Sequence, residues 1–212
     1  MKRLNNKGIT TIEVIISFVI VVIISASLYT TVTNYNQKRL IEGYKSKTQI
    51  GRLYERFIGY EYEKSGYQVK YFGALNGFED LGRDLIVQKG KNTLIIQCKY
   101  WSKEKEIHEN AICQLYGTAL KYTIEHKGAK VNPILITSTK CSDMAHEFAT
   151  ALNVTIIENK PLENYPMIKC NIGKNGEKIY HLPIDQQYDK IKIEYKKGEF
   201  YAESCMDASL HG

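Results

Sequence analysis

Two runs decide the fold of this chain: Gly82-Arg83-Asp84-Leu85-Ile86-Val87 and Leu94-Ile95-Ile96-Gln97-Cys98-Lys99. Both are rich in aliphatic and β-branched residues, which is typical of strands. The segment Lys89-Gly90-Lys91-Asn92 lies between them and predicts a tight turn. We therefore expect an antiparallel hairpin at the centre of the fold.

The register of this hairpin brings polar side chains together. A two-residue turn makes Lys89 face Asn92, and Asp84 then faces Gln97. Lys99 shares the face of Gln97, because side chains alternate along a strand. We expect a carboxylate, an amide and an ammonium group within side-chain reach, in strands that are otherwise apolar.

This set of groups suits phosphodiester hydrolysis. A hard cation takes oxygen ligands, which Asp84, the Gln97 side chain and a nearby backbone carbonyl can supply. The metal polarises the phosphoryl group, while Lys99 orients water or neutralises developing charge. The structural alternative is an ion pair between Asp84 and Lys99 on a solvated face. The hairpin by itself does not decide between the two.

Regular elements are predicted on both sides of the hairpin. Helical spacing of apolar residues predicts a helix over 49–65, and a short strand follows over 67–72. After the hairpin we expect a helix over 109–124, a strand over 133–137, a helix over 143–152 and a strand over 154–157. The order α-β-β-β-α-β-α-β predicts an α/β fold with a mixed central sheet flanked by helices.

The N-terminal part is apolar for about 20 residues, the length of a bilayer-spanning helix. Residues 9–30 include Val19-Ile20-Val21-Val22-Ile23-Ile24, which is apolar on every side of a helix. We expect one transmembrane helix here. A buried core helix is a weaker alternative, because so small a protein could hardly bury it. A cleaved signal peptide is also weaker, since no clear small-x-small site follows.

The flanking charges lean towards a cytoplasmic catalytic domain, and hence a single-pass protein of the inner (cytoplasmic) membrane. A third interpretation remains open. The segment Lys7-Gly8-Ile9-Thr10-Thr11-Ile12-Glu13 resembles the prepilin processing motif, which would favour a pilin-like envelope component. Cleavage after Gly8 would support that alternative.

The length of the chain allows one ordinary domain plus short accessory segments. We divide the 212 residues into a tail (1–8), a transmembrane helix (9–30), a linker (31–48), a catalytic domain (49–160) and a small β-rich module (161–212). Alternating runs at 190–195 and 199–202 suggest strands in that module. The net charge of +6 fits either nucleic acid or an anionic membrane. Five scattered cysteines without a CxxC pair argue against disulfides and zinc.

The hairpin motif resembles a known family. Asp84…Gln97-Cys98-Lys99 is similar to the Gln-x-Lys variant of PD-(D/E)XK nucleases, in particular to the catalytic domain of Mrr-type restriction endonucleases. The resemblance extends from about residue 51 to residue 158. It includes Tyr54-Glu55-Arg56-Phe57, Lys64-Ser65-Gly66-Tyr67-Gln68-Val69, Gln97-Cys98-Lys99-Tyr100-Trp101, Gln114-Leu115-Tyr116-Gly117, Ile134-Leu135-Ile136-Thr137-Ser138 and Ala145-His146-Glu147-Phe148-Ala149.

The resemblance implies a restriction-endonuclease-like fold that cuts double-stranded DNA with Mg²⁺, for which Mn²⁺ is a plausible substitute. Asp84 and Gln97 match the metal-binding positions, Lys99 the catalytic lysine, and Glu55 an acid on the first helix that supports the site. A solvated surface acid is the alternative for Glu55, and a surface or packing residue is the alternative for Gln114.

Contacts to DNA are expected from Lys99 and from the residues around it: Arg83, Tyr100, Trp101 and Gln114. The chain departs from the family in Glu79-Asp80-Leu81-Gly82-Arg83, where extra charges replace a glycine-rich run. The module faintly resembles the zinc-binding module of Ada-type repair proteins over residues 178–183 and 198–202. The cysteines that such a site needs are absent, so we predict no zinc.

The sequence thus predicts a membrane-anchored, metal-dependent DNA endonuclease with a role in restriction of foreign DNA. A catalytically silent DNA-binding module on the same fold is the alternative, and intact Asp84, Gln97 and Lys99 weigh against it. A homodimer is left open beside a monomer.

Overall fold

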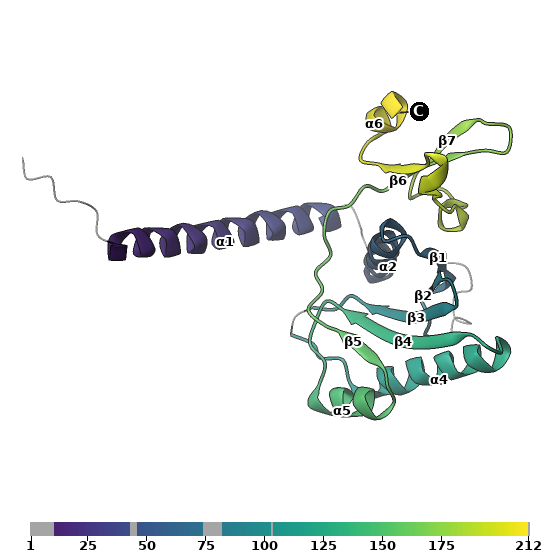
Figure 1. Cartoon of the computed structure of the whole chain (residues 1–212), viewed down its shortest axis with the longest axis horizontal. Helices are drawn as coiled ribbons and strands as arrows, with labels where there is room; N and C mark the ends of the chain where they lie inside the picture. Colours follow the sequence, from purple (N-terminus) through teal and green to yellow (C-terminus); the bar gives the residue numbers. More distant parts are fainter. Residues whose placement is uncertain (1–10, 43–45, 74–81, 103, 212) are drawn as a thin grey trace, which may run out of the picture. The chain divides into compact units, whose positions relative to one another are not determined.

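The computed structural model describes residues 11–42, 46–73, 82–102 and 104–211 (Figure 1). The chain divides into two compact units, Met1–Gly43 and Tyr44–Gly212. The second unit contains both sheets and the candidate site.

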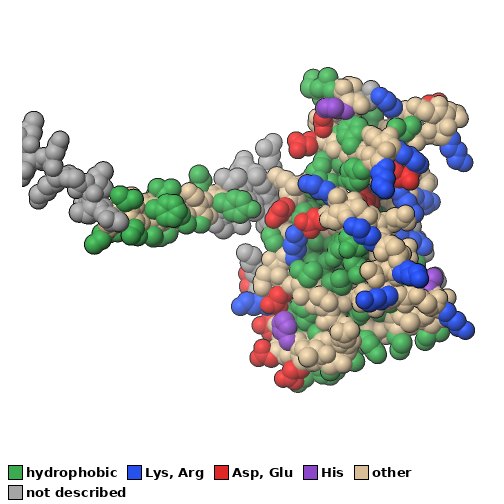
Figure 2. Space-filling model, viewed as in Figure 1, with side chains coloured by type: hydrophobic (Ala, Val, Ile, Leu, Met, Phe, Trp, Pro, Cys, Tyr) green, Lys and Arg blue, Asp and Glu red, His purple; other side chains and the backbone are tan. Residues whose placement is uncertain are grey.

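The first unit is built around a single long helix, α1 (Thr11–Glu42). Its large apolar side chains from Ile12 to Tyr29, where described, are exposed (Figure 2). Hydroxyl groups bond back to the helix itself: Ser25 Oγ donates to the Val21 carbonyl at 2.7 Å and Thr31 Oγ1 to the Ser27 carbonyl at 2.9 Å.

A membrane span is not found among the residues that the structure describes, because no helix there is both long and apolar enough. The transmembrane helix expected at residues 9–30 is therefore not confirmed. Residues 9 and 10 lie outside the described part of the chain.

The second unit contains a mixed sheet of five strands in the order β1-β2-β3-β4-β5. Strand β2 is antiparallel to β1 and to β3, while β4 runs parallel to both β3 and β5. The strands are β1 (Gln68–Tyr71), β2 (Leu85–Lys89), β3 (Asn92–Lys99), β4 (Lys130–Thr137) and β5 (Thr155–Ile157). This confirms the α/β class and the mixed central sheet.

Helices cover both faces of this sheet (Figure 1). Helix α2 (Lys47–Lys64) lies on one face, and α4 (Glu109–Glu125) and α5 (Asp143–Ala151) lie on the other. The order α2-β1-β2-β3-α4-β4-α5-β5 is the order that the sequence predicts. Each face of the sheet is therefore apolar, which explains the nearly continuous aliphatic runs in β3 and β4.

Local sequence signals account for several boundaries. Ser46 and Gln49 form a capping box at the start of α2, and Ser142 Oγ accepts from the Ala145 N–H at the start of α5. The predicted hairpin is confirmed, since Lys89 pairs with Asn92. Gly90 has a φ of 62°, a conformation that glycine adopts without strain.

The C-terminal part forms a second sheet in the order β7-β6-β8. Its elements are β6 (Ile168–Ile172), β7 (Lys178–His181), two 3₁₀ turns η2 (Tyr188–Lys190) and η3 (Tyr195–Lys197), β8 (Phe200–Ala202) and α6 (Cys205–His211). We call residues 168–211 the C-terminal module.

The strand expected at 190–195 is wrong, because this run lies across the two 3₁₀ turns. Its backbone is bonded to side chains instead of to a neighbouring strand. Lys169 Nζ donates to the Ile191 carbonyl at 2.8 Å, and the Glu194 N–H donates to Glu199 Oε2 at 2.7 Å. Apolar alternation cannot reveal such side-chain bonds.

Candidate active site

Asp84 lies at the end of the central hairpin, directly before β2. The paired residues of β2 and β3 end at Leu85 and Ile96, and the Asp84 N–H donates to the Ile96 carbonyl at 2.9 Å. Its carboxylate Oδ2 accepts the Cys98 N–H at 2.6 Å. The side chain is thus held against β3, one residue from both Gln97 and Lys99.

Gln97 is completely buried, with an exposed fraction of 0%. Its Nε2 donates to Gln114 Oε1 of α4 at 3.4 Å, a long hydrogen bond. Its Oε1 is buried and has no hydrogen-bond partner among the described residues. An unpartnered buried oxygen costs about 1–3 kcal/mol, so this amide is placed unfavourably unless something else binds it.

Gly82 is packed against the same amide. A Cβ atom at this position would lie 2.6 Å from Gln97 Nε2 and 2.8 Å from Gln114 Cδ, and the φ of Gly82 is 78°. A side chain here would therefore be strained and would displace both glutamines. Gly82 is a site residue that the sequence reasoning missed; its position two residues before Asp84 was the available signal.

The remaining predicted groups gather around Cys98. Burial raises the pKa of the Cys98 thiol well above its usual value, the negative charges of Asp84 and Glu55 raise it further, and Lys99 opposes them. Two acids and one lysine therefore lie close enough to act on one buried thiol. The ion pairs of the described residues do not include one between Asp84 and Lys99, so the structural alternative gains no support.

The donor set fits a hard cation. The Asp84 carboxylate and the orphaned Gln97 Oε1 are oxygen donors on neighbouring positions of the hairpin, as a magnesium or manganese ion prefers. The described residues contain no group of three or more His, Cys, Asp and Glu placed to hold a metal. The amide oxygen of Gln97 is thus the feature that would complete such a site.

The residues predicted to contact DNA differ in their exposure and in the side chains that they pack against. Arg83 is 8% exposed and its guanidinium lies 4.1 Å from the centre of the Phe72 ring. The Tyr100 ring packs 5.2 Å from that of Tyr54. Trp101 is 44% exposed. Of these aromatic groups, Trp101 is the more accessible. The charged segment Glu79-Asp80 lies outside the described residues.

A second buried polar cluster joins α2 to the C-terminal module. Lys169 is completely buried, and its Nζ lies 4.7 Å from the ring centres of Tyr71 and Tyr188. Burial lowers the pKa of Lys169 to about 8, against the opposing effect of Glu63. Burial raises the pKa of Glu63, against Lys169 and the phenols of Tyr201 and Tyr71, and Tyr201 donates to its Oε2.

Arg56 forms the other half of this contact. Its Nε and Nη2 donate to the two carboxylate oxygens of Asp189, each at 2.8 Å, and Nη1 donates to the Pro183 carbonyl at 3.0 Å. The guanidinium also lies 4.5 Å from the Tyr188 ring centre. We call Arg56, Glu63, Lys169, Asp189 and Tyr201 the α2 clamp. It fixes the helix that carries Glu55.

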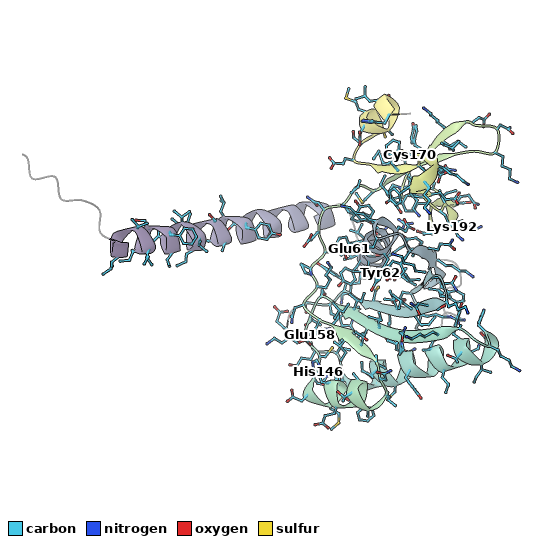
Figure 3. All side chains as sticks on the ribbon, viewed as in Figure 1. Glu61, Tyr62, His146, Glu158, Cys170 and Lys192 are labelled. Carbon is cyan, nitrogen blue, oxygen red and sulfur yellow. The ribbon has the colours of Figure 1, made fainter. Side chains whose placement is uncertain are left out.

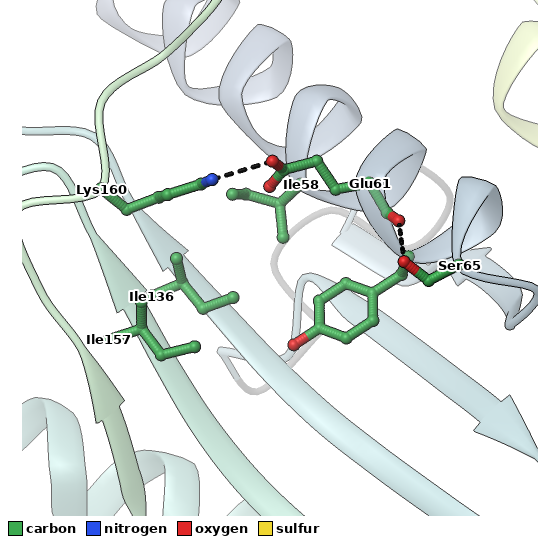
Figure 4. A pocket seen from close by; sticks show the side chains of 7 residues that line it. Ile58, Glu61, Ser65, Ile136, Ile157 and Lys160 are labelled. Atoms are coloured by element: carbon green, nitrogen blue, oxygen red, sulfur yellow. Dashed lines mark hydrogen bonds and ion pairs between the residues drawn. The ribbon is translucent and has the colours of Figure 1, made fainter.

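A cavity of about 300 Å³ lies between α2 and the edge of the sheet (Figure 4). Glu61 and Tyr62 reach it from α2 (Figures 3 and 4). Lys160 Nζ donates to Glu61 Oε1 at 2.8 Å across its mouth. The cavity is lined by Ile58, Glu61, Tyr62, Ser65, Ile136, Ile157 and Lys160. None of these is a predicted site residue.

The comparison with protein families identifies the α/β domain that carries this candidate site. The Mrr catalytic family, described as "Restriction endonuclease", matches residues 48–165, more than half of the chain. The chain therefore belongs to this restriction endonuclease family. No curated protein matches the chain.

Two solved structures are similar at a lower level. One is the crystal structure of a protein of unknown function, AF1548, with 17% identity, a TM-score of 0.41, and coverage of 50% of this chain and 58% of that one. The other is the MspJI restriction endonuclease in complex with a 27-mer oligonucleotide, with 13% identity, a TM-score of 0.39, and coverage of 58% and 28%. The chain thus spans less than two thirds of either.

Proposed function

We propose that this chain is a membrane-anchored, metal-dependent DNA endonuclease that restricts foreign DNA. The observation that carries the nuclease proposal is the buried, unpartnered Gln97 Oε1 on β3, the strand whose Cys98 N–H holds the Asp84 carboxylate. Buried polar atoms are almost always bonded, and a bound ligand would account for this orphaned oxygen. Membership of a restriction endonuclease family supplies the reaction class.

In this proposal Asp84 and Gln97 hold Mg²⁺, which, when bound, polarises the scissile phosphodiester. Other groups of the chain position these two side chains and neutralise developing charge. Gln114 takes the amide hydrogen of Gln97 and so leaves Oε1 directed away from that bond. The Cys98 N–H fixes the Asp84 carboxylate. Lys99 follows on the same strand and neutralises charge that develops on the phosphate.

Double-stranded DNA is the proposed substrate, and the positive net charge of +6 is consistent with a polyanion. Trp101 and Lys99 are the groups proposed to contact it first, because Trp101 is exposed and Lys99 is partly so. Gln114 is exposed on α4 and accepts a hydrogen bond from Gln97. It is proposed to contact the DNA as well as Gln97.

The test is cleavage of supercoiled plasmid by the full-length protein in mild detergent, with Mg²⁺ or with EDTA. Asp84→Asn keeps an acceptor for the Cys98 N–H but loses the charge, and Lys99→Ala loses the ammonium. We expect each to lower Mg²⁺-dependent nicking by roughly a thousandfold. Lys91→Ala, in the exposed turn of the same hairpin, is the control and should cut normally.

Metal binding has its own readout. Millimolar Mn²⁺ or Mg²⁺ should raise the melting temperature of the parent, because a ligand that binds only the folded state stabilises it. It should not raise that of Asp84→Asn. Cutting in EDTA, or a metal-independent melting temperature in the parent, would contradict the proposed site.

The anchor is proposed from residues 9–30, a stretch of sequence almost free of charge, and the catalytic domain is placed in the cytoplasm of an inner-membrane protein. A nuclease held there would meet DNA as it enters the cell, which is the reason for proposing restriction. If the protein is released from membranes by alkaline carbonate, the anchor is excluded. If transformation by unmodified plasmid is as efficient with the protein as without it, restriction is excluded.

A further inference from the structure

Arg83 is a buried cation without a counter-charge among the described residues. The residue is 8% exposed, and its Nε–H has no hydrogen-bond partner there. The ion pairs of the described residues do not include it either. Removing a charge from water is strongly unfavourable unless an opposite charge or hydrogen bonds replace the water. A buried guanidinium of this kind therefore indicates a place for an anion.

An aromatic ring supports this guanidinium. The Arg83 Cζ lies 4.1 Å from the centre of the Phe72 ring, and the Nζ of the exposed Lys70 lies 5.2 Å from the same centre. The face of an aromatic ring attracts a cation, which offsets part of the cost of burial. The ring offers no acceptor to the Nε–H, however. Two positive groups around one ring also create a local positive potential, which attracts an anion further.

The contact between Arg83 and Phe72 lies beside the candidate metal site. The Phe72 N–H donates to the Asp84 carbonyl at 2.8 Å, which continues the pairing of β1 with β2. Phe72 packs against the core cluster to which α4 contributes, and Gln97 bonds to Gln114 of α4. Both therefore lie on the same face of the sheet. Neighbouring strands are about 5 Å apart, so the contact is roughly one strand spacing from Asp84.

Trp101 lies on the other side of the metal site. It follows β3, and its N–H donates to Ser138 Oγ, directly after β4, at 2.9 Å. Since the strand order is β1-β2-β3-β4, the groups proposed to hold the metal lie between Arg83 and Trp101. A DNA strand that passes across these strand ends would contact Arg83 before or after it contacts the metal.

The chemistry of a guanidinium suits a phosphate. Its planar fork of N–H groups matches two oxygens of a phosphate, and such charge-assisted hydrogen bonds are stronger than neutral ones. The candidate site already requires one phosphodiester at Asp84. A neighbouring phosphate of the same backbone is therefore the anion that the proposed substrate would bring to Arg83.

We propose that Arg83, held on the Phe72 ring with Lys70 beside it, forms a subsite for a DNA backbone phosphate next to the scissile one. This inference rests on the proposed function, and it adds Lys70 and Phe72 to the residues that position the substrate. The subsite reads no bases, because a phosphate carries no sequence information. It needs no metal, so it binds DNA in EDTA.

Fluorescence anisotropy of a labelled short duplex with full-length protein in mild detergent and EDTA tests the subsite. Arg83→Met should raise the dissociation constant about tenfold or more, by the same factor for two duplexes of unrelated sequence. It should also reduce the slope of log K against log salt by about one. Lys70→Met should have a smaller effect, about threefold, because this lysine is exposed.

Arg52→Met is the matched control, since Arg52 is an exposed arginine on α2. It should bind as the parent does. An unchanged dissociation constant in Arg83→Met, or an equal loss in Arg52→Met, overturns the subsite. A parent that cuts DNA while Arg83→Met binds normally refutes the subsite alone. A parent that binds through Arg83 but does not cut refutes the nuclease proposal instead.

Thermal unfolding distinguishes a binding role of Arg83 from a structural one. Methionine keeps the length of the side chain and also packs well on an aromatic ring. Arg83→Met should therefore keep the melting temperature of the free protein or raise it by about 2–4 °C, while the stabilisation by added duplex shrinks. A fall of roughly 5 °C or more would mean that an acid of the chain pairs with Arg83, and it would overturn the proposal.

Competition identifies the chemistry of the anion. Inorganic phosphate should displace the duplex from the parent more strongly than chloride does at equal ionic strength, and Arg83→Met should lose this difference. Acetate at the same ionic strength is the control for a carboxylate. If acetate competes as strongly as phosphate, or if phosphate acts equally on Arg83→Met, the assignment of a phosphate subsite is wrong.

Discussion

Polar side chains are buried both in the α2 clamp and at the candidate site, and the two regions differ in how these groups are bonded. In the α2 clamp, Arg56 meets Asp189 with two hydrogen bonds, and Lys169 donates to two backbone carbonyls. At the candidate site, Gln97 is buried to the same degree as Lys169, yet its Oε1 has no partner among the described residues.

This difference distinguishes a polar region whose groups are bonded within the chain from one that leaves a buried oxygen unbonded. Groups that are satisfied inside the chain hold the module against α2, and removal of one leaves its partner buried without compensation. A buried oxygen without a partner contributes nothing to the isolated chain and costs stability. A metal ion bound as proposed would supply the missing partner.

The largest expected effect is on activity, at Gln97. Gln97→Leu should lower Mg²⁺-dependent DNA cleavage by roughly a thousandfold. Its unfolding free energy should stay the same or rise by about 1 kcal/mol, because the unpartnered oxygen is removed. Plasmid nicking and urea unfolding measure the two quantities. Gln97→Glu keeps an oxygen at this position and should remain active, and a clear loss of stability in Gln97→Leu would show that the amide is structural.

The opposite pattern is expected at Arg56. Arg56→Ala leaves the Asp189 carboxylate buried without its partner and should lower the unfolding free energy by about 3–5 kcal/mol. Arg52→Ala, an exposed position on the same helix, should change it by less than about 0.5 kcal/mol. Urea titration of the three proteins measures this. Equal stability of both variants would mean that the clamp does not hold the module.

Gly82 and Gly90 both have a positive φ, but only Gly82 packs against the site. Gly90→Ala, with no atom within 4 Å of its Cβ, should cost about 1–2 kcal/mol from backbone strain alone. Gly82→Ala should cost about 1–3 kcal/mol more and also reduce cleavage, because its Cβ would displace the Gln97 amide. If both variants lose equal stability and keep full activity, Gly82 does not shape the site.

The smallest effect is the pH dependence of the clamp. Lys169 has a folded pKa of about 8, below its ordinary value of 10.5. Between these values the unfolded chain binds more protons, so this lysine makes the unfolding free energy rise with pH, by about 1–2 kcal/mol up to pH 9.5. Lys169→Met should lack that rise. Above pH 10 the buried phenols of Tyr71 and Tyr201, with raised pKa values, act in the opposite direction.

Most of the catalytic domain was predictable because its signals are local. Runs rich in aliphatic and β-branched residues placed β2 and β3, and the Gly90-Lys91 turn fixed their register through Lys89 and Asn92. Helical spacing placed α2, α4 and α5. Proximity of Asp84 to Gln97 and Lys99 followed from that register, since these residues are close along a hairpin.

The α2 clamp was not predictable in this way. Glu63 and Lys169 are far apart in the sequence, and a lysine in a short alternating run is ordinarily a solvent-facing residue. The bonds of Lys169 to the Tyr188 and Ile191 carbonyls also explain why residues 190–195 do not form the expected strand. Such contacts depend on which surfaces meet after folding.

The sequence by itself determined the order of the elements, the hairpin register and the residue types at the candidate site, because each depends on neighbours along the chain. The tertiary structure decided which apolar residues of α4 face the core, that Gly82 lies against Gln97 and Gln114, and which polar groups are satisfied. These follow from packing between distant segments, because the apolar residues of a helix do not by themselves show which of them the sheet will cover.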